Sequence, residues 1–187
     1  PNLITLQDIQ CDLHCHTTAS DGHMSIEELA THAITRGYHT IAVTDHSQSQ
    51  TQANGLKPDR LRIHIEKIRE ANNTIDGITI LAGSEVDILP DGSLDYDDDV
   101  LTLLDIVVAS PHAALSQSPT DATKRLLAAI EHPLVHIIGH PTGRIINKRK
   151  GLEPDMPTLV SAASDNNTAL EINANSYRLD LRDIHVR

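Results

Sequence analysis

The sequence predicts an α/β fold with a parallel β-sheet and a barrel-like arrangement of its strands and helices. Three observations lead to this prediction. Short apolar runs alternate with longer amphipathic stretches along the 187 residues. The apolar runs are nearly continuous, which is typical of strands that are buried on both faces of a parallel sheet. Strands that alternate with helices pair in parallel through right-handed crossover connections.

Six apolar runs are predicted to form the buried strands. They lie at residues 9–15, 39–45, 78–85, 104–110, 135–140 and 168–174. Six such units are fewer than the eight of a standard (β/α)₈ barrel, although their spacing suits a barrel-like arrangement. The length of the chain fits a single domain, which we expect to span residues 1–187.

Helices are predicted between the strands from their capping residues. The first helix, in residues 25–37, has Ser25 as its cap, Glu28 three positions later and Gly37 at its end. Further helices are predicted at 57–72, 118–132 and 154–166. The last residues, 178–187, resemble a helix that is just starting. We therefore expect the C-terminal part of the domain to lie outside this chain.

Composition narrows the classes of function. The formal net charge is −11 and no run of basic residues forms an obvious nucleic-acid footprint, which disfavours tight DNA binding by this segment alone. Phe and Trp are absent and Tyr occurs three times, so stacking of bases on aromatic side chains is not expected.

The cysteines and the hydropathy pattern indicate the cellular compartment of the protein. Cys11 and Cys15 lie four apart on one predicted strand, where their side chains cannot easily form a disulfide. No apolar stretch reaches the roughly 18 to 20 residues of a membrane span, and the first residues lack the layout of a signal peptide. We therefore predict a reducing, cytoplasmic location without a membrane partner.

Metal-ligand residue types recur where the predicted strands end. The carboxyl ends of parallel barrel strands share one rim, which is where active sites are built. We therefore expect these side chains to converge on one pocket. In chain order they are His14 and His16, His46, Glu85, His112 and His140.

The residue types at these strand ends suit a metal centre. Imidazole and carboxylate groups bind Zn, Mn or Fe, and a carboxylate such as Glu85 can bridge two ions. His14 and His16 are two apart on a strand, so their side chains point to the same face. Asp21, in the following loop, can return toward them. Cys15 must point the other way, and we predict that it packs in the core.

A structural role is the alternative for every histidine. A single histidine at a strand end is more often a hydrogen-bonding residue than a ligand, but five successive strand ends make that interpretation weak. For the remaining histidines a solvated or structural role is predicted: His23, His32, His39, His64, His132, His136 and His185. The acidic run 95–99 lacks the spacing of an EF-hand, and we predict a solvated loop there.

These motifs together resemble a known family. "DLHCHTTASDG", "TDHS", "GSEVD", "SPH" and "GHPTGR" resemble the polymerase and histidinol phosphatase (PHP) superfamily of metal-dependent phosphoesterases over essentially the whole chain. The blocks "ANGL", "LAGSEVDILPDGSLDYDD", "HPTGR" and "ALEINANSYRLDLRD" are most similar to the C-terminal PHP domain of bacterial X-family DNA polymerases.

The resemblance implies a distorted (β/α)7 TIM-like barrel that holds two or three Mn or Zn ions, with Fe as a further option. It implies that Arg144 and Lys148 lie near the incoming phosphate and that Glu85 bridges ions. The final Asp-x-His of the family has no counterpart here, so we expect the last βα portion and two ligands to lie outside residues 1–187 or in a partner chain. The implied ligands within the chain are His14, His16, Asp21, His46, Glu85, His112 and His140.

The predicted activity is metal-assisted hydrolysis of a phosphate ester, with water as the nucleophile and Arg144 stabilising charge on the phosphate oxygens. The resemblance favours the 3′-5′ exonuclease and 3′-phosphatase domain of an X-family DNA polymerase, whose upstream polymerase domain would grip the DNA. Two alternatives stay open: a stand-alone phosphatase of the histidinol-phosphatase type, and a non-catalytic structural module of a polymerase. The sequence identifies neither the metal nor the oligomeric state.

Overall fold

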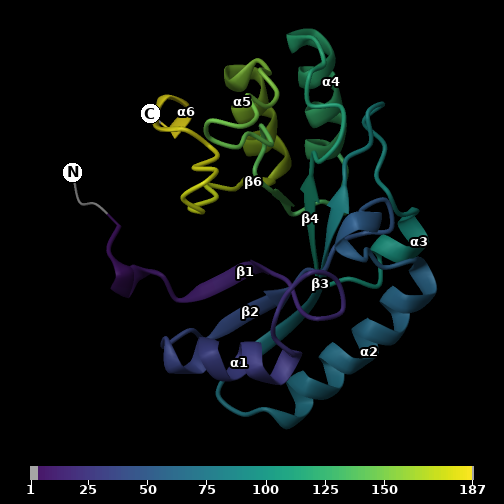
Figure 1. Ribbon diagram of the computed structural model, residues 1–187, viewed down its shortest axis with the longest axis vertical. Helices are drawn as coiled ribbons and strands as arrows, with labels where there is room; N and C mark the ends of the chain where they lie inside the picture. The colour runs from purple at the N-terminus through teal and green to yellow at the C-terminus, as the bar shows by residue number, and fades with distance from the viewer. Residues whose placement is uncertain (1–3, 187) are drawn as a thin grey trace. The chain divides into compact units, whose positions relative to one another are not determined.

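The computed structural model describes residues 4–186, which form an α/β fold (Figure 1). The chain divides into two compact units. The first unit comprises Pro1–Ser84 and Thr102–Ile106, and the second comprises Glu85–Leu101 and Val107–Arg187. No helix within the described residues combines the length and the apolar character needed to cross a membrane.

All six predicted strands are confirmed, and their pairing is parallel within each unit. The strands follow one another in the sheet in chain order, as successive βα units require. The fifth and sixth strands are much shorter than predicted. The strands are β1 (Cys11–Cys15), β2 (Thr40–Val43), β3 (Thr79–Asp87), β4 (Ile106–Ser110), β5 (Ile137–Ile138) and β6 (Ala169–Leu170).

The four predicted helices between the strands are confirmed within a few residues at each end. A short final helix also begins where the sequence indicated one. The α-helices are α1 (Ile26–Thr35), α2 (Pro58–Thr74), α3 (Asp98–Leu101), α4 (Pro119–Ile130), α5 (Met156–Asn166) and α6 (Asp183–Val186). Two 3-10 helices, η1 (Leu6–Asp8) and η2 (Thr51–Ala53), were not predicted.

The prediction of a solvated loop at residues 95–99 is wrong in part. Asp98 and Asp99 form the first turn of α3, and Tyr96 is 4% exposed. Val100 and Leu101 in this helix are both buried. Their burial explains the difference, because it stabilises one helical turn that an acidic run would not form by itself.

In the first unit, α1 and α2 lie on the same side of β1, β2 and β3 (Figure 1). Ile41 on β2 pairs with Ile80 on β3, and Leu61 and Ile68 on α2 are fully buried. Gly83 permits a close approach of the chain, because a Cβ atom at this position would lie 2.7 Å from the Ile106 side chain. The helices therefore cover one face of the strands whose ends carry the predicted ligands.

In the second unit, Ile137 on β5 pairs with Val108 on β4 and with Ala169 on β6. Helices α4 and α5 pack against each other. The Arg125 side chain of α4 is also buried, and its guanidinium group donates to the carbonyl oxygens of Ile88 and Ala113. These bonds satisfy a charged group inside the unit and tie α4 to the segments that follow β3 and β4.

The predicted cap of α1 is present. The Ser25 side chain accepts a hydrogen bond from the Glu28 backbone N–H at 3.2 Å, and the Glu28 carboxylate accepts one from the Ser25 backbone N–H at 2.8 Å. Ser25→Ala is expected to lower the free energy of unfolding by about 1 kcal/mol, because the helix loses its cap. Urea denaturation measures this loss. The exposed Ser116→Ala change is the control and should stay within about 0.5 kcal/mol of the parent protein.

Candidate functional site

The first unit gathers four of the predicted ligands, which we call the histidine cluster: His14, His16, Asp21 and His46. His14 lies on β1, and His16 directly follows that strand. The ring centroids of His14 and His16 are 5.4 Å apart, and those of His16 and His46 are 4.3 Å apart. The expectation that His14 and His16 share a face is consistent with this spacing.

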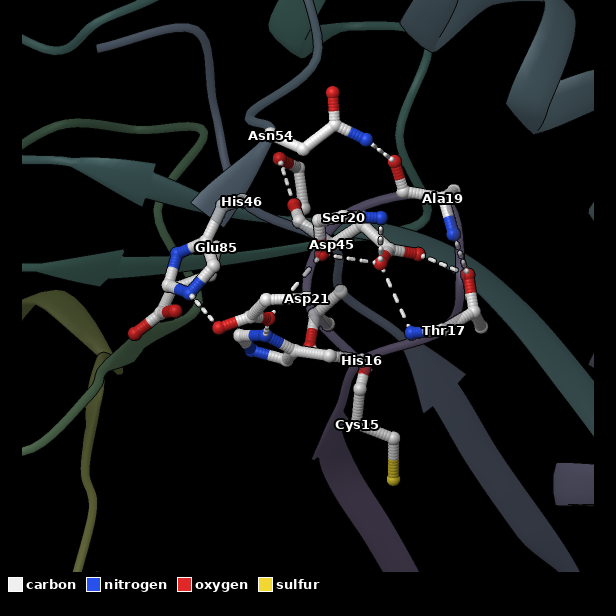
Figure 2. Close-up of polar contacts among 12 residues, drawn as sticks. Cys15, His16, Thr17, Ala19, Ser20, Asp21, Asp45, His46, Asn54 and Glu85 are labelled. Carbon is white, nitrogen blue, oxygen red and sulfur yellow. Dashed lines mark hydrogen bonds and ion pairs between the residues drawn. The ribbon is translucent and has the colours of Figure 1, made fainter. Parts of the chain in front are cut away.

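Asp21 joins two of these rings. Its Oδ1 lies 2.8 Å from His16 Nδ1 and its Oδ2 lies 3.5 Å from His46 Nε2 (Figure 2). Partial burial by itself would raise the pKa of Asp21, but the hydrogen bond with His16 and the charge of His46 hold this pKa below its usual value. The loop after β1 therefore returns a carboxylate to the histidines, as predicted.

A buried carboxylate fixes the loop that carries Asp21. Asp45 is 0% exposed and accepts hydrogen bonds from the backbone N–H and side chain of Thr17 and from the backbone N–H and side chain of Ser20 (Figure 2). His64 Nε2 on α2 lies 2.8 Å from Asp45 Oδ2. Burial by itself would raise the pKa of Asp45, but these hydrogen bonds hold it below its usual value. Asp45 thus links the loop to α2. In the chain, Asp45 directly precedes His46.

Cys15 is not part of the histidine cluster. Figure 2 shows its side chain pointing away from the His16 ring. Cys15 is buried, burial raises the pKa of its thiol, and both Cys15 and Cys11 are free. The predictions that Cys15 packs in the core and that the two cysteines do not bridge are confirmed.

The second unit gathers the other predicted ligands with one unpredicted residue. We call Glu85, Asp87, His112 and His140 the glutamate cluster. Glu85 is 1% exposed, and its Oε1 lies 2.7 Å from His140 Nε2 and 3.3 Å from His112 Nε2. Asp87 Oδ1 lies 2.6 Å from His112 Nδ1. One buried carboxylate oxygen therefore faces two imidazoles from different strand ends.

The two imidazoles of the glutamate cluster differ in their electrostatics. Burial by itself would lower the pKa of His112, but its hydrogen bonds with Asp87 and Glu85 raise this pKa to about 9. Burial lowers the pKa of His140, which outweighs the effect of its bond with Glu85. Asp87 orients the His112 ring, because a bond at Nδ1 directs Nε2 toward Glu85.

His140 is held in an unusual backbone conformation. Its φ angle is 26°, which a residue with a side chain rarely adopts. Its backbone N–H donates to Glu171 Oε2 at 2.5 Å, and its carbonyl oxygen accepts from Gly143 N–H at 2.8 Å. Strained residues that are held by their surroundings cluster at functional sites. This observation supports a functional role for His140.

The two residues predicted near the phosphate follow His140 in the chain. The Nε atom of Arg144 donates to the Arg178 carbonyl oxygen at 2.7 Å, and Arg144 is half-buried. Lys148 is exposed in the loop that follows. Both stay predicted phosphate-binding residues.

One of the histidines that were predicted to have a structural or solvated role is buried. His64 is 6% exposed and bonds to Asp45, so its structural role is confirmed. His39 lies 2.8 Å from Thr40 Oγ1, and His132 lies 3.2 Å from Asp98. These contacts are with side chains outside the two clusters, and they support the structural interpretation.

Sequence reasoning missed Asp45, Asp87 and Glu171. For Asp87 and Glu171, the sequence contains a pattern that could have identified them. Asp87 is two residues after Glu85 on one strand, so the alternation of strand side chains places both on the same face. Glu171 directly follows β6 and thus obeys the strand-end rule that identified the histidines. Asp45 ends the run of β2 before His46, but its side-chain partners come from the loop after β1 and from α2, which no spacing reveals.

A known protein family matches most of the chain. The model of the family described as "PHP domain" matches residues 12–175. The chain belongs to the PHP family. The match includes every residue of the histidine cluster and the glutamate cluster, and the resemblance inferred from the motifs is confirmed.

Several curated proteins are similar to this PHP chain. "DNA polymerase/3'-5' exonuclease PolX" of Bacillus subtilis is 50% identical over 184 residues, which cover 98% of this chain and 32% of that protein. A "Probable phosphatase" of Caldicellulosiruptor bescii is 32% identical over 90% of this chain and 67% of its own length. A "Probable phosphatase" of Syntrophotalea carbinolica is also 32% identical, with the same coverage. The chain thus spans about a third of the first relative and two thirds of the others.

Proposed function

We propose that this PHP chain is a metal-dependent phosphoesterase. The observation that carries the proposal is the glutamate cluster, in which the buried Glu85 faces His112 and His140 through one oxygen. A buried carboxylate set against two imidazoles is a metal-binding combination, since nitrogen and oxygen donors of this kind hold Zn, Mn or Fe. Asp87 adds the carboxylate–histidine bond that commonly orients a ligating imidazole.

The histidine cluster has the same donor chemistry. Three imidazoles and the Asp21 carboxylate lie together, and the lowered pKa of Asp21 keeps that group ionised near neutral pH. The residues proposed as metal ligands are His14, His16, Asp21, His46, Glu85, His112 and His140. It stays a prediction that all seven residues bind two or three ions in one centre.

The residues of the chain would perform three tasks in the reaction. Bound divalent ions would supply Lewis acidity and activate water for attack on phosphorus. Glu85 would hold ions through its buried carboxylate, and Asp87 would fix the ring of His112. Arg144, whose Nε atom is anchored on the Arg178 carbonyl oxygen, would direct its guanidinium group at phosphate oxygens and stabilise their charge. No serine or cysteine nucleophile is needed.

The proposed substrate is the 3′ end of DNA. The chain would act as the 3′-5′ exonuclease and 3′-phosphatase domain of an X-family polymerase, and its proposed location is cytoplasmic. The support is the 50% identity to the B. subtilis relative, whose name includes the 3′-5′ exonuclease activity. The phosphatase names of the other relatives favour a second candidate, which is hydrolysis of a small phosphomonoester.

Hydrolysis with and without metal tests the proposal. Release of phosphate from an aryl phosphate, and shortening of an oligonucleotide from its 3′ end, are measured with Mn²⁺ or Zn²⁺ and again after chelation. Both activities should fall to background after chelation and return with added metal. Activity that is unchanged by chelation would contradict the proposal. A ratio of kcat/KM values that favours the small ester by several orders of magnitude would select the second candidate.

A further inference from the structure

The turn that carries His140 is held by two carboxylates of the C-terminal segment. Glu171 Oε2 accepts a hydrogen bond from the His140 backbone N–H at 2.5 Å. Two residues later, the Thr142 backbone N–H donates to Asp180 Oδ2 at 3.1 Å and to Asp180 Oδ1 at 3.3 Å. The bond from Gly143 N–H to the His140 carbonyl oxygen closes the turn. One buried turn therefore directs two of its backbone N–H groups at carboxylate oxygens.

The backbone of Glu171 is fixed on both sides. Its N–H donates to the Ile138 carbonyl oxygen on β5 at 3.0 Å, and its carbonyl oxygen accepts from Leu181 N–H at 3.3 Å. Asn173 and Asp180 exchange two backbone hydrogen bonds, of 2.5 Å and 3.2 Å. Glu171 and Asp180 therefore belong to one framework that is attached to β5.

The side chain of Glu171 is also held. Its Oε2 atom accepts a second hydrogen bond from Asn173 Nδ2 at 3.3 Å, and the residue is half-buried. A carboxylate is a stronger acceptor for an N–H group than a neutral oxygen is. Partial burial strengthens such a bond further, because the surroundings screen it less than water does. Glu171 thus offers His140 a strong acceptor in a fixed position.

His140 needs a partner of this kind. Its φ angle of 26° is one that residues with a side chain rarely adopt, and such a conformation persists only where the surroundings fix it. A buried N–H group without an acceptor would add a further cost. The bond with Glu171 meets both requirements, because it is made to the N–H group of the strained residue itself.

The backbone conformation of His140 determines where its imidazole lies. In this conformation Nε2 lies 2.7 Å from Glu85 Oε1, and a different φ angle would swing the ring away from the glutamate cluster. We propose that Glu171 is a positioning residue, which directs the His140 imidazole into the glutamate cluster through the bond to the His140 N–H. The inference rests on the proposed metal-dependent function. In this role Glu171 binds the backbone of a metal ligand and not the metal.

Two variants of Glu171 separate the hydrogen bond from the negative charge. Glu171→Gln keeps an acceptor oxygen in place but removes the charge, whereas Glu171→Asp keeps the charge but withdraws the oxygen by about 1.5 Å. Affinity for Zn²⁺ is measured by competition with a chromogenic chelator, without a phosphate ester. Glu171→Gln should bind within about threefold of the parent protein, and Glu171→Asp should bind about 10- to 100-fold more weakly. Parent-like affinity in Glu171→Asp, or equal weakening in both variants, would overturn the proposal.

Asp155→Ala is the matched control for a general loss of stability. Asp155 caps α5 in the same unit, and its Oδ1 atom accepts from Thr158 N–H at 3.4 Å. Asp155→Ala and Glu171→Asp should each lower the urea midpoint by about 0.5 M. Only Glu171→Asp should lose affinity for Zn²⁺. Equal loss of affinity in the two variants would show that Glu171 acts on stability alone and would overturn the positioning role.

A double-mutant cycle tests whether Glu171 acts through His140. In the His140→Ala background, Glu171→Asp should change the affinity for Zn²⁺ by less than about threefold, because the imidazole that Glu171 positions is absent. A further loss of about 10- to 100-fold in that background would mean that Glu171 contributes to metal binding without His140, and would overturn the positioning role. A parent protein that binds Zn²⁺ but hydrolyses no phosphate ester would contradict the phosphoesterase function alone.

Discussion

Asp45→Ala is expected to lower the free energy of unfolding by about 3 to 5 kcal/mol, the range for breaking a buried charged pair. Asp45 is fully buried and accepts hydrogen bonds from Thr17 and Ser20 and pairs with His64. Its removal leaves these donors without their acceptor inside the first unit, and each one then bears a desolvation cost. Urea denaturation measures the effect.

The control for this prediction is Asp76→Ala. Asp76 is exposed in the turn before β3 and should change stability by less than about 0.5 kcal/mol. A decrease smaller than about 1 kcal/mol in Asp45→Ala would contradict the account of the buried network.

The same variant should show a distinct pH dependence. The pKa of Asp45 is lowered in the folded protein, so its stabilising contribution is present above the pKa of the unfolded chain and is lost as the pH falls through the folded pKa. The stability difference between parent and Asp45→Ala should therefore shrink in acid. A difference that grows below about pH 4, where an ordinary aspartate becomes protonated, would mean that the carboxylate is not the stabilising form.

Glu85→Gln is expected to reduce phosphoester hydrolysis by more than about 100-fold. Loss of a partner that merely orients a metal ligand costs about 10- to 100-fold, and Glu85 is proposed as a ligand itself. Glutamine keeps the size of the side chain but removes the negative charge that faces His112 and His140. The measurements are the hydrolysis rate with saturating Mn²⁺ and the metal content after dialysis.

Two comparisons make the Glu85 result specific. Glu131→Gln, at the exposed end of α4, should leave both rate and metal content unchanged. Glu85→Ala, with the side chain removed, should lose metal and hydrolysis together. A Glu85→Gln protein that keeps full metal content and full activity would contradict the proposed role. Absence of both metal and hydrolysis in the parent would instead favour a structural module.

The sequence predicted the six strands in their order, although β5 and β6 are shorter than predicted, and it predicted most residues of the two clusters. Buried strands such as β2 and β4 are nearly continuous apolar runs, and the strand-end rule found Glu85, His112 and His140 without three-dimensional information. It could not show that Glu85 bonds to both histidines through one oxygen, because that depends on side-chain placement in space. Asp45 was missed for the same reason.

Prediction from local sequence also failed where burial in the tertiary structure decides the local conformation. The acidic run around Asp98 has little helix-forming tendency of its own, yet burial of Val100 and Leu101 produces α3.

Elemental analysis of protein purified without chelators is the most direct test of the central claim, which is that the histidine and glutamate clusters bind catalytic metal ions. The account predicts two or three equivalents of Mn, Zn or Fe per chain, lost in parallel with hydrolysis when a chelator is titrated and reduced in Glu85→Gln. Protein that hydrolyses phosphate esters at full rate with less than a tenth of an equivalent of any transition metal would contradict it.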